Sequence, residues 1–531
     1  MTEPATTAHG RAADAFEPLR ALLAKALPRL LTQLCRDPDH PLYGCFDRHH
    51  WHYKMRDFSS AVVVQGALVL HEIALGRLDL PVPELDPVRA AAWRDAALRH
   101  WVHSQHADGS FDEYYPSESG FPAAGFSLYA AAVIAQTQPP SAEVARAMTR
   151  AAAWILRSAE TEAVNQEIIA LAACTLAARA GIAVDTAALE RRWVVVHEGQ
   201  SSEGWYEEYG GADTGYLAVA CDALWDTWEA TGDERARAAG LRAVGYLHAL
   251  LGAGGDVPRF VNSRNTDYLS GYGVVRFASI SPEAAAVVHA TVSRVESPRH
   301  FLHHIDDRYL AHYVHTSWYR ALAHLGAMGR AAPPARGARW FPHARILVAH
   351  EAGASVYVAA GKGSTVVRAG ADGEMEFDQG WRGEVAGRLT STCWQEAEAT
   401  VSARADGGAW IVRTEMPLRR HAFMVPSPLK HLVLRVAGAI AGRHLIPFLK
   451  KRLIFRGETN GARFVREVRV EHGQAWIRDA FSGKPLEHRR REGAYSLRHV
   501  SSAGGFLFAE LAPGEGSANL HSEAEPARPR G

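Results

Sequence analysis

The chain has 531 residues, of which 47% are hydrophobic and 22% are charged, as is usual for a globular protein. This length exceeds what one compact core supports, so we expect two or three domains. Lysine plus arginine and aspartate plus glutamate both number 58, which leaves no overall basic field and argues against nucleic acid as a partner.

The cysteines and the first residues exclude further classes. Five cysteines form no CxxC pair and leave one over, which argues against a disulfide framework and against a cysteine zinc site. Residues 1–20 show no basic start followed by an apolar core, so we expect no secretory signal and a cytoplasmic location. No run of about 20 uncharged apolar residues predicts a membrane span.

We expect residues 1–17 to form a flexible lead-in, after which one pattern repeats. A helix rich in alanine and leucine ends near an aromatic residue, a polar loop follows, and a second apolar helix returns. The expected helices are 19–34, 60–75, 90–101, 126–135, 142–156, 168–180, 189–196, 217–228, 235–251, 271–278 and 308–325. Paired helices at a period of roughly 45–55 residues indicate stacked helical hairpins, either as a solenoid or closed into a ring.

Equivalent loops of stacked hairpins lie at one end of the assembly. The loops around Asp108, Asn165, Glu203 and Arg264 are therefore expected on one rim. The loop of residues 203–216 is the most distinctive, with three tyrosines, three glutamates and four glycines. Such a loop suits the mouth of a cleft, although a solvated turn whose aromatic residues cover the core is an alternative.

The character of the chain changes near residues 331–334. We expect a linker over 331–342, an antiparallel β-sandwich over 343–512 and a disordered tail, rich in proline, glycine, serine and charge, over 513–531. The expected strands are 344–349, 355–360, 364–368, 384–390, 398–404, 409–413, 463–471, 475–479 and 506–511.

Residues 417–456 fit the sandwich poorly, because they contain nine lysines and arginines, apolar runs and no acidic residue. One interpretation is an amphipathic basic helix that makes peripheral contact with an anionic membrane, at its cytoplasmic face, or with an acidic polymer. The other, which we favour, is an insertion whose apolar face is packed and whose basic face is solvated.

Three stretches carry a resemblance to a known family: Phe46-Asp-Arg-His-His-Trp51, Asp108-Gly-Ser-Phe-Asp-Glu-Tyr-Tyr-Pro116 and Gly204-Trp-Tyr-Glu-Glu-Tyr-Gly-Gly-Ala-Asp-Thr-Gly-Tyr216. With a helical half followed by a β half, the chain resembles the heparinase II/III-like polysaccharide lyases from about Phe46 to Leu511. The resemblance implies an N-terminal (α/α) toroid over 18–330, followed by a C-terminal β-sandwich. It also implies cleavage of an acidic, uronic-acid-containing polysaccharide by β-elimination, in capsule or exopolysaccharide metabolism.

β-Elimination removes the proton from C5 of a uronic acid while the neighbouring carboxylate is neutralised by an amide or a cation. Carried over by position, Asn165 would neutralise the carboxylate and Tyr209 would be the base, with Tyr206 and Tyr216 as substitutes. Arg264, or His49 or His50, would supply positive charge. The expected substrate-binding residues are His50, Trp51, Asp108, Phe111, Tyr115, Trp205, Tyr206, Glu208, Asp213, Tyr216, Asp267 and Tyr268.

Alternatives remain at several positions. Asn165 could instead cap the helix that starts near Ile168. Where lyases of this group often present a histidine block, residues 360–370 contain none, and Lys362, His343 and His350 are the nearest substitutes. His303, His304, Asp306, Asp307, His312 and His315 lack a recognised ligand motif, so we expect neither a metal nor another cofactor.

Two other function classes stay open. Helical toroids also host glycoside hydrolases with paired carboxylates, and the candidates are Asp112, Glu113, Glu207, Glu208 and Asp213. The other class is a non-catalytic carbohydrate-binding or assembly protein that works with membrane-bound glycan machinery, which the missing histidines and the basic residues of 417–456 favour.

Overall fold

The structure is a computed structural model, and the residues it describes are 15–81, 85–255, 257–351, 353–421, 425–441, 444, 445, 448, 458–493 and 520–524. Most of the expected lead-in 1–17, the expected strand 506–511, parts of 417–456 and all of the tail 513–531 except 520–524 lie outside these residues.

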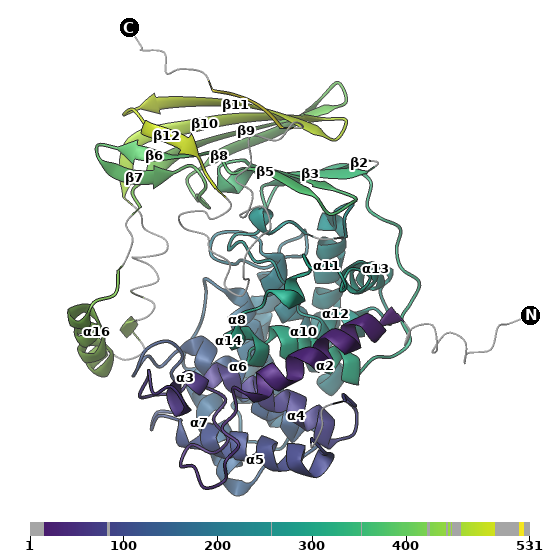
Figure 1. The fold of residues 1–531 in the computed structure, drawn as a ribbon, viewed down its shortest axis with the longest axis vertical. Coiled ribbons are helices and arrows are strands. Elements are labelled where there is room, and N and C mark those ends of the chain that lie inside the picture. Colours follow the sequence, from purple (N-terminus) through teal and green to yellow (C-terminus); the bar gives the residue numbers. More distant parts are fainter. Residues whose placement is uncertain are drawn as a thin grey trace, which may run out of the picture.

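Within the described residues, six inner helices form a closed ring. The helical half occupies the lower part of Figure 1. The inner helices are α4 (Gly66–Ala74), α6 (Phe121–Ala135), α8 (Val164–Arg179), α10 (Thr214–Thr231), α12 (Tyr272–Phe277) and α15 (Val314–Ala323). Each contacts the next in this order, and α15 contacts α4. The helical half is therefore a toroid, and the prediction of a helical toroid followed by antiparallel sheets is confirmed.

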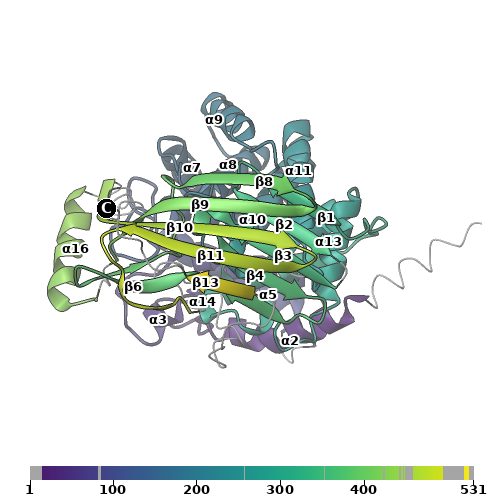
Figure 2. The same ribbon diagram turned by 90° about the horizontal axis from the view of Figure 1, so that it is seen from above.

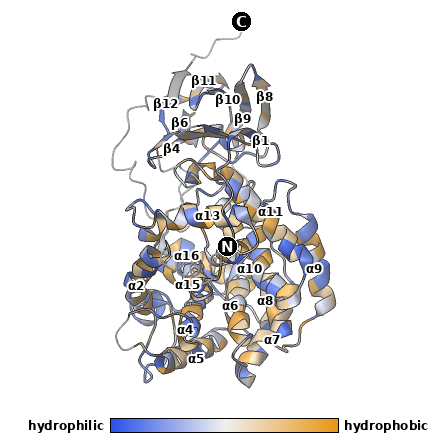
Figure 3. Ribbon diagram, turned by 90° about the vertical axis from the view of Figure 1, so that its right-hand side faces the viewer, coloured by the Kyte–Doolittle hydropathy of each residue, from blue (hydrophilic) through white to orange (hydrophobic). Residues whose placement is uncertain are grey.

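Outer helices surround this ring. They are α2 (Glu17–Leu31), α5 (Pro87–His103), α7 (Ala142–Leu156), α9 (Thr186–Glu198), α11 (Glu234–Leu250) and α13 (Pro282–Val292). The outer helices bury one stripe each, as α7 does through Val144, Ala147, Met148 and Ala151, whereas nearly every residue of α6 is buried. Figure 3 shows the same contrast, with hydrophobic colours on α6 and α8 and mixed colours on α9.

Several shorter helical elements connect the pairs: α3 (Arg48–Trp51), η1 (Ala61–Gln65), η2 (Arg259–Val261), η3 (Phe301–His303) and α14 (Asp307–Ala311). The expected helix 308–325 is broken between α14 and α15, where Tyr313 has a positive φ of 35°. Helix α13 was not expected, although Ser281 caps it by accepting a hydrogen bond from the backbone N–H of Ala284 (3.2 Å) and Pro282 starts it.

The strands that the structure describes form three sheets. The first, in the order β1 to β5, is antiparallel: β1 (Gly337–Phe341), β2 (Ile346–Glu351), β3 (Ala354–Ala359), β4 (Thr365–Gly370) and β5 (Met375–Asp378). The second has the order β13-β11-β10-β9-β8: β8 (Thr400–Asp406), β9 (Ala409–Arg419), β10 (Thr459–Glu471), β11 (Gln474–Gly483) and β13 (Leu520–Ala524), the last parallel to β11. The third, small sheet has β6 (Trp381–Val385), β7 (Arg388–Ser391) and β12 (Glu487–Arg491).

Two strand predictions differ from this arrangement. Strand β1 lies inside the segment 331–342 that was expected to be a linker. The expected strand 384–390 is a hairpin, because Ala386 and Gly387 both have positive φ and turn the chain between β6 and β7.

The central strands of the first sheet, β2 to β4, are buried on both faces. Leu347 and Val356 pack with Val412 of the second sheet, whereas Val348 and Tyr357 join the core of the toroid. The Tyr357 hydroxyl donates a hydrogen bond to the carbonyl of Leu250, the last residue of α11 (2.9 Å). The sandwich thus covers the end of the ring where outer helices end and inner helices begin, as Figures 1 and 2 show.

Helix α16 (Pro428–Ala441) follows β9 and leaves the sandwich. Figure 1 shows it beside the toroid, away from the sheets, and the two guanidinium nitrogens of Arg435 contact the carboxylate of Asp57 at 2.8 and 2.9 Å. Within the described part of the chain, no helix is both long and apolar enough to cross a bilayer.

Candidate active site

Three loops that precede inner helices meet under the sandwich. We name them the first site loop (residues 160–165), the second (203–213) and the third (259–271). The backbone N–H and the side-chain amide of Asn165 donate hydrogen bonds to the carboxylate of Glu208, at 2.7 and 2.6 Å. The hydroxyl of Ser263 donates to the carbonyl oxygen of Glu208 (2.6 Å). These hydrogen bonds therefore join the three site loops at one rim, although the loops are far apart in the sequence.

Asn165 does not cap α8. The N-cap position is Ala163, and Asn165 lies in the first turn, where the Glu208 carboxylate accepts the N–H that a cap would otherwise satisfy. Burial raises the pKa of Glu208 well above its ordinary value, although the hydrogen bonds from Asn165 oppose this shift. The carboxylate of Glu208 thus fixes the orientation of the Asn165 amide.

A phenol and a guanidinium group lie near Gln166, the residue that follows Asn165. The hydroxyl of Tyr209 accepts a hydrogen bond from the side chain of Gln166 (3.3 Å), and the guanidinium carbon of Arg264 lies 4.8 Å from the centre of the Tyr209 ring. Tyr209 has a φ of 55°, which is an unfavourable backbone conformation for a tyrosine. Its N–H donates to the carbonyl of Glu162 (2.7 Å), which helps to hold it there.

Asp213, an expected substrate-binding residue, has a different place. It is buried and caps α10 by accepting hydrogen bonds from the N–H groups of Gly215 (3.1 Å) and Tyr216 (3.2 Å). It also accepts from the N–H of Arg264 (3.1 Å) and from the hydroxyl of Thr266. Asp213 therefore positions the third site loop rather than a sugar.

Five tyrosines extend from this point in what we call the tyrosine row. Successive ring centres are 6.3, 6.2, 5.6 and 5.3 Å apart along Tyr209, Tyr216, Tyr268, Tyr313 and Tyr309. The hydroxyls of Tyr268 and Tyr313 are 3.1 Å apart. Tyr309 and Tyr313 were not expected in the site, because the sequence pattern placed both within one continuous helix.

The far end of the tyrosine row carries a second arginine that the sequence analysis missed. The Arg308 guanidinium carbon lies 4.4 Å from the ring centre of Tyr114 and 5.9 Å from that of Tyr309. The same group forms an ion pair with Glu113 (2.5 Å). The row therefore runs between two cations, Arg264 and Arg308.

Burial controls the protonation of the phenols in the row. Desolvation raises the pKa of Tyr216 well above its ordinary value, the Tyr209 phenol raises it further, and Arg264 opposes the shift. Desolvation likewise raises the pKa of Tyr268 and of Tyr313. These three phenols are consequently neutral over the physiological range of pH.

The sandwich contributes two polar side chains that contact the rim. The ammonium group of Lys362 is buried and donates hydrogen bonds to the carbonyls of Phe260 (3.2 Å) and Asn262 (2.8 Å) and to the side chain of Asn265. Burial lowers the pKa of Lys362 to about 8. Gln395 donates to the carbonyl of Gly210 (2.8 Å). Lys362, considered as a substitute for the missing histidines, thus holds the third site loop from the side of the sandwich.

Two residues expected to contact substrate belong instead to the framework of the helical pairs. Phe111 is fully buried and its ring stacks on Trp101 at 5.1 Å, so it is not placed to contact substrate as expected. Asp108 closes a turn by accepting hydrogen bonds from the backbone N–H (3.0 Å) and hydroxyl (2.6 Å) of Ser110. Tyr115 lies in the same loop, where its N–H donates to Glu118 (3.1 Å).

The turn at Asp108 is one copy of a repeated structure. The side chain of Gln105 donates to the carbonyls of Gly109 and Ala147, and that of Gln200 donates in the same way to the carbonyls of Gly204 and Ala239. Two aromatic residues follow the second copy of this turn and belong to the same framework. Trp205 and Tyr206 are buried, and the indole N–H of Trp205 donates to Glu203 (2.8 Å).

The remaining expected residues lie farther along the rim. His50 contacts the carbonyl of Arg56 (3.0 Å), and the indole of Trp51 donates to the carbonyl of Gln33 (2.7 Å). Asp267 forms an ion pair with Arg259 (3.4 Å) and lines a cavity of about 110 Å³. His303 and His304 contact backbone carbonyls, and His312 contacts Gln65 (2.7 Å).

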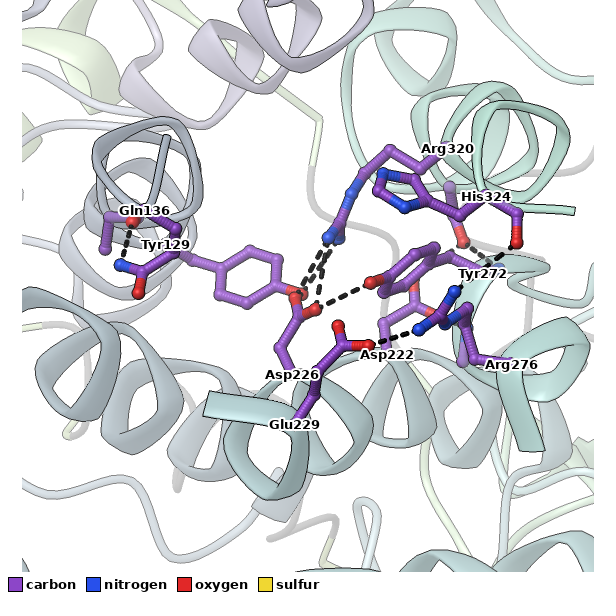
Figure 4. A network of polar contacts seen from close by, with 12 residues as sticks. Tyr129, Gln136, Asp222, Asp226, Glu229, Tyr272, Arg276, Arg320 and His324 are labelled. Atoms are coloured by element: carbon purple, nitrogen blue, oxygen red, sulfur yellow. Dashed lines mark hydrogen bonds and ion pairs between the residues drawn. The ribbon is translucent and has the colours of Figure 1, made fainter. Parts of the chain in front are cut away.

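A second cavity, of about 510 Å³, lies at the C-terminal ends of inner helices, and part of its polar lining is shown in Figure 4. There Asp226 accepts hydrogen bonds from Tyr129 and Tyr272 and pairs with Arg320 (3.1 Å). The Arg320 guanidinium carbon lies 3.7 Å from the centre of the Tyr272 ring. Because each charge has its partner inside the protein, we regard this network as part of the toroid's framework.

No protein-family model and no curated protein sequence matches the chain, so membership of the heparinase II/III-like family stays a prediction. Among solved structures, the chain is similar to a xanthan lyase from Paenibacillus at 11% identity and a TM-score of 0.44, over 78% of this chain and 48% of that one. It is also similar to the chondroitin AC lyase of Streptomyces coelicolor A3 in complex with chondroitin sulphate, at 14% identity and a TM-score of 0.41, over 76% of this chain and 67% of that one. A tyrosine-to-alanine variant of that lyase matches at 14% identity and a TM-score of 0.39, over 79% and 70%. The chain thus spans about half the length of the xanthan lyase structure.

Proposed function

We propose that this protein cleaves an acidic, uronic-acid-containing polysaccharide by β-elimination at the rim under the sandwich. The observation that carries the proposal is that the three loops bearing Asn165, Tyr209 and Arg264 are joined by hydrogen bonds at one rim. Gln166, next to Asn165, donates to the Tyr209 hydroxyl, and Arg264 lies over the Tyr209 ring. This is the set of groups that elimination next to a carboxylate requires.

Asn165 neutralises the substrate carboxylate in this proposal. An amide nitrogen carries two hydrogens, and the carboxylate of Glu208 accepts one of them, which leaves the other for the substrate. As the C5 proton leaves, negative charge spreads onto the carboxylate, and a donor already held in place stabilises it without reorganisation.

Tyr209 is the base in this proposal. Its phenolate takes the proton from C5, the bond between C4 and the leaving oxygen breaks, and a C4–C5 double bond forms. The same phenol then gives the proton to the leaving oxygen. Because a free tyrosine has a pKa of about 10, the nearby cation of Arg264 is needed to make the phenolate accessible.

Tyr216, which is partly exposed, and Arg308 with the exposed Tyr114 beside it bind the polymer in this proposal. Tyr268, Tyr309 and Tyr313 are buried and support these residues from within. Aromatic side chains offer apolar faces and hydroxyls to sugar rings. Arg308 supplies a second cation for another acidic unit, although it must exchange its contact with Glu113 to do so.

A second candidate is a carbohydrate-binding protein without cleavage. The raised pKa of the partly exposed Tyr216 favours it, since a neutral phenol binds sugars but removes no proton. It uses the same rim and the same two arginines.

The test is incubation with a panel of uronic-acid polymers while the absorbance of the new C4–C5 double bond is followed. We expect absorbance to rise with the unchanged protein and to be lost in Tyr209→Phe and Asn165→Ala. Tyr246→Phe is the matched control, because its hydroxyl is buried on α11 without a hydrogen-bond partner in the described chain. Binding without absorbance on every polymer would support the second candidate. Absorbance that survives Tyr209→Phe would contradict the assignment of the base.

A further inference from the structure

Helix α16 exposes its large apolar side chains to solvent. Leu429, Leu432, Val433, Val436 and Ile440 are 70%, 60%, 58%, 51% and 82% exposed, respectively. A helix in which every large aliphatic residue of one face is this exposed is unusual in a soluble domain, where such a face is normally buried.

The face of α16 that meets the toroid is centred on Gly438, with the half-buried Leu434 beside it. Gly438 is the buried residue of this helix, and a side chain there would lie 3.2 Å from the carbonyl oxygen of Pro116. The ion pair of Arg435 with Asp57 adds a second attachment. The interpretation that we favoured from the sequence, a packed apolar face, is therefore wrong for this helix. It docks through glycine and leaves its larger apolar residues outward.

The exposed residues form one continuous stripe. At about 100° per residue, the five side chains fall within an arc of about 100° on the helix surface. Lys430 and Arg435 lie on either side of this stripe, each about 60° from its edge. An apolar stripe bordered by cations on both sides is typical of helices that lie in the interface of a membrane.

We propose that α16 binds the surface of an anionic bilayer, with the stripe inserted at the boundary between headgroups and acyl chains. Residues 417–456 contain nine lysines and arginines and no acidic residue. A soluble acidic polymer would satisfy these cations but leave the stripe in water. A second copy of the chain would cover the stripe but bring two sets of cations together. An anionic bilayer would both pair with the cations and cover the stripe.

The helix lies on the membrane in this proposal and does not cross it. It has 14 residues, fewer than the about 20 that span the hydrocarbon core. Its binding does not depend on the activity proposed for the rim, so the two proposals stand or fall separately.

Flotation of the full chain with vesicles tests the proposal. We expect binding to vesicles of equimolar phosphatidylcholine and phosphatidylglycerol, and much weaker binding to phosphatidylcholine alone. Lys430→Gln should lower the partition coefficient about fivefold, because each cation near an anionic surface contributes about 1 kcal/mol. Leu432→Glu combined with Val436→Glu should lower it more than about tenfold.

The matched control is Val195→Glu, which changes a residue of α9 that is 69% exposed and far along the chain from α16. It should leave vesicle binding unchanged, and circular dichroism would verify that all variants are folded. Equal binding to neutral and anionic vesicles would overturn the role of the cations. Failure to float with either, or a dimer in solution that the stripe variant dissociates, would overturn the proposal as a whole.

Discussion

The pair formed by Asn165 and Glu208 determines which way the catalytic amide of the proposed mechanism faces. The side-chain bond between them is 2.6 Å long, and Glu208 is 1% exposed. Leaving one partner of a buried hydrogen bond unsatisfied costs about 1–3 kcal/mol. Asn165→Ala removes this bond alone, since its backbone N–H still reaches Glu208. We therefore expect a coupling free energy of about 1–3 kcal/mol between the two side chains.

Urea unfolding of four proteins measures this coupling: the unchanged chain, Asn165→Ala, Glu208→Ala and the double variant. The exposed ion pair of Arg235 with Glu190, at 2.6 Å, serves as the matched control cycle. Exposed pairs couple by about 0–1 kcal/mol. If the Asn165–Glu208 coupling were no larger than that of the control, Glu208 would not hold the amide and the reasoning would fail.

Glu208→Gln tests whether activity depends on the orientation of the Asn165 amide rather than on the stability of the fold. The new amide nitrogen would face the Asn165 nitrogen, so two donors would meet unless the Asn165 amide turns over. Turning it over restores a hydrogen bond but directs the oxygen, rather than the nitrogen, at the substrate carboxylate. We expect a loss of stability of no more than about 1–3 kcal/mol together with loss of activity.

Three further predictions concern the framework. Lys362→Met should destabilise the fold by about 3–5 kcal/mol in urea unfolding, because three buried acceptors lose the same ammonium group; a loss within about 0.5 kcal/mol would contradict this. Arg320→Met should cost about 3–5 kcal/mol by the same assay, since it leaves Asp226 buried and unpaired, whereas the double change Arg320→Met with Asp226→Leu should recover much of the loss. His106 has a pKa raised by its ion pair with Asp112, so the stability it adds is full below pH 6.5 and disappears as pH rises through the raised pKa. The difference between the unchanged chain and His106→Gln should therefore shrink between about pH 5 and 9, and a difference that grows would refute the sign.

The sequence predicted the architecture of the helical half well because its signal is local. Alternating apolar helices and polar loops indicate stacked pairs, and equivalent loops of stacked pairs must share an end. The meeting of the loops that contain Asn165, Glu208 and Arg264 follows from that argument, and the structure brings these loops together. The individual roles in catalysis remain predictions.

What the sequence could not indicate depends on contacts between distant segments. Arg308 joins the site because α14 ends at Ala311 and Tyr313 takes a strained backbone conformation, whereas the apolar pattern predicted one unbroken helix. Phe111 lies in a loop whose composition is typical of binding loops, but its ring stacks on Trp101 inside the protein. Lys362 lies about 100 residues from the acceptors it holds, and no local pattern links them.

Helix α16 shows a different limit. Its pattern is amphipathic on any reading, but a helical wheel does not reveal which face meets the protein. Here Gly438 permits the close approach, so the face centred on it docks and the stripe remains in water. Only the packing against Pro116 decides between the two interpretations.

The central claim is that the rim cleaves a uronic-acid polymer by elimination with Tyr209 as the base. The most direct measurement is the mass of the new chain ends formed in water labelled with heavy oxygen. Elimination adds no water, so we predict unsaturated ends without the label, and no new ends with Tyr209→Phe. Hydrolysis would place labelled oxygen in the product, and labelled ends, or unsaturated ends formed equally well by Tyr209→Phe, would contradict the account.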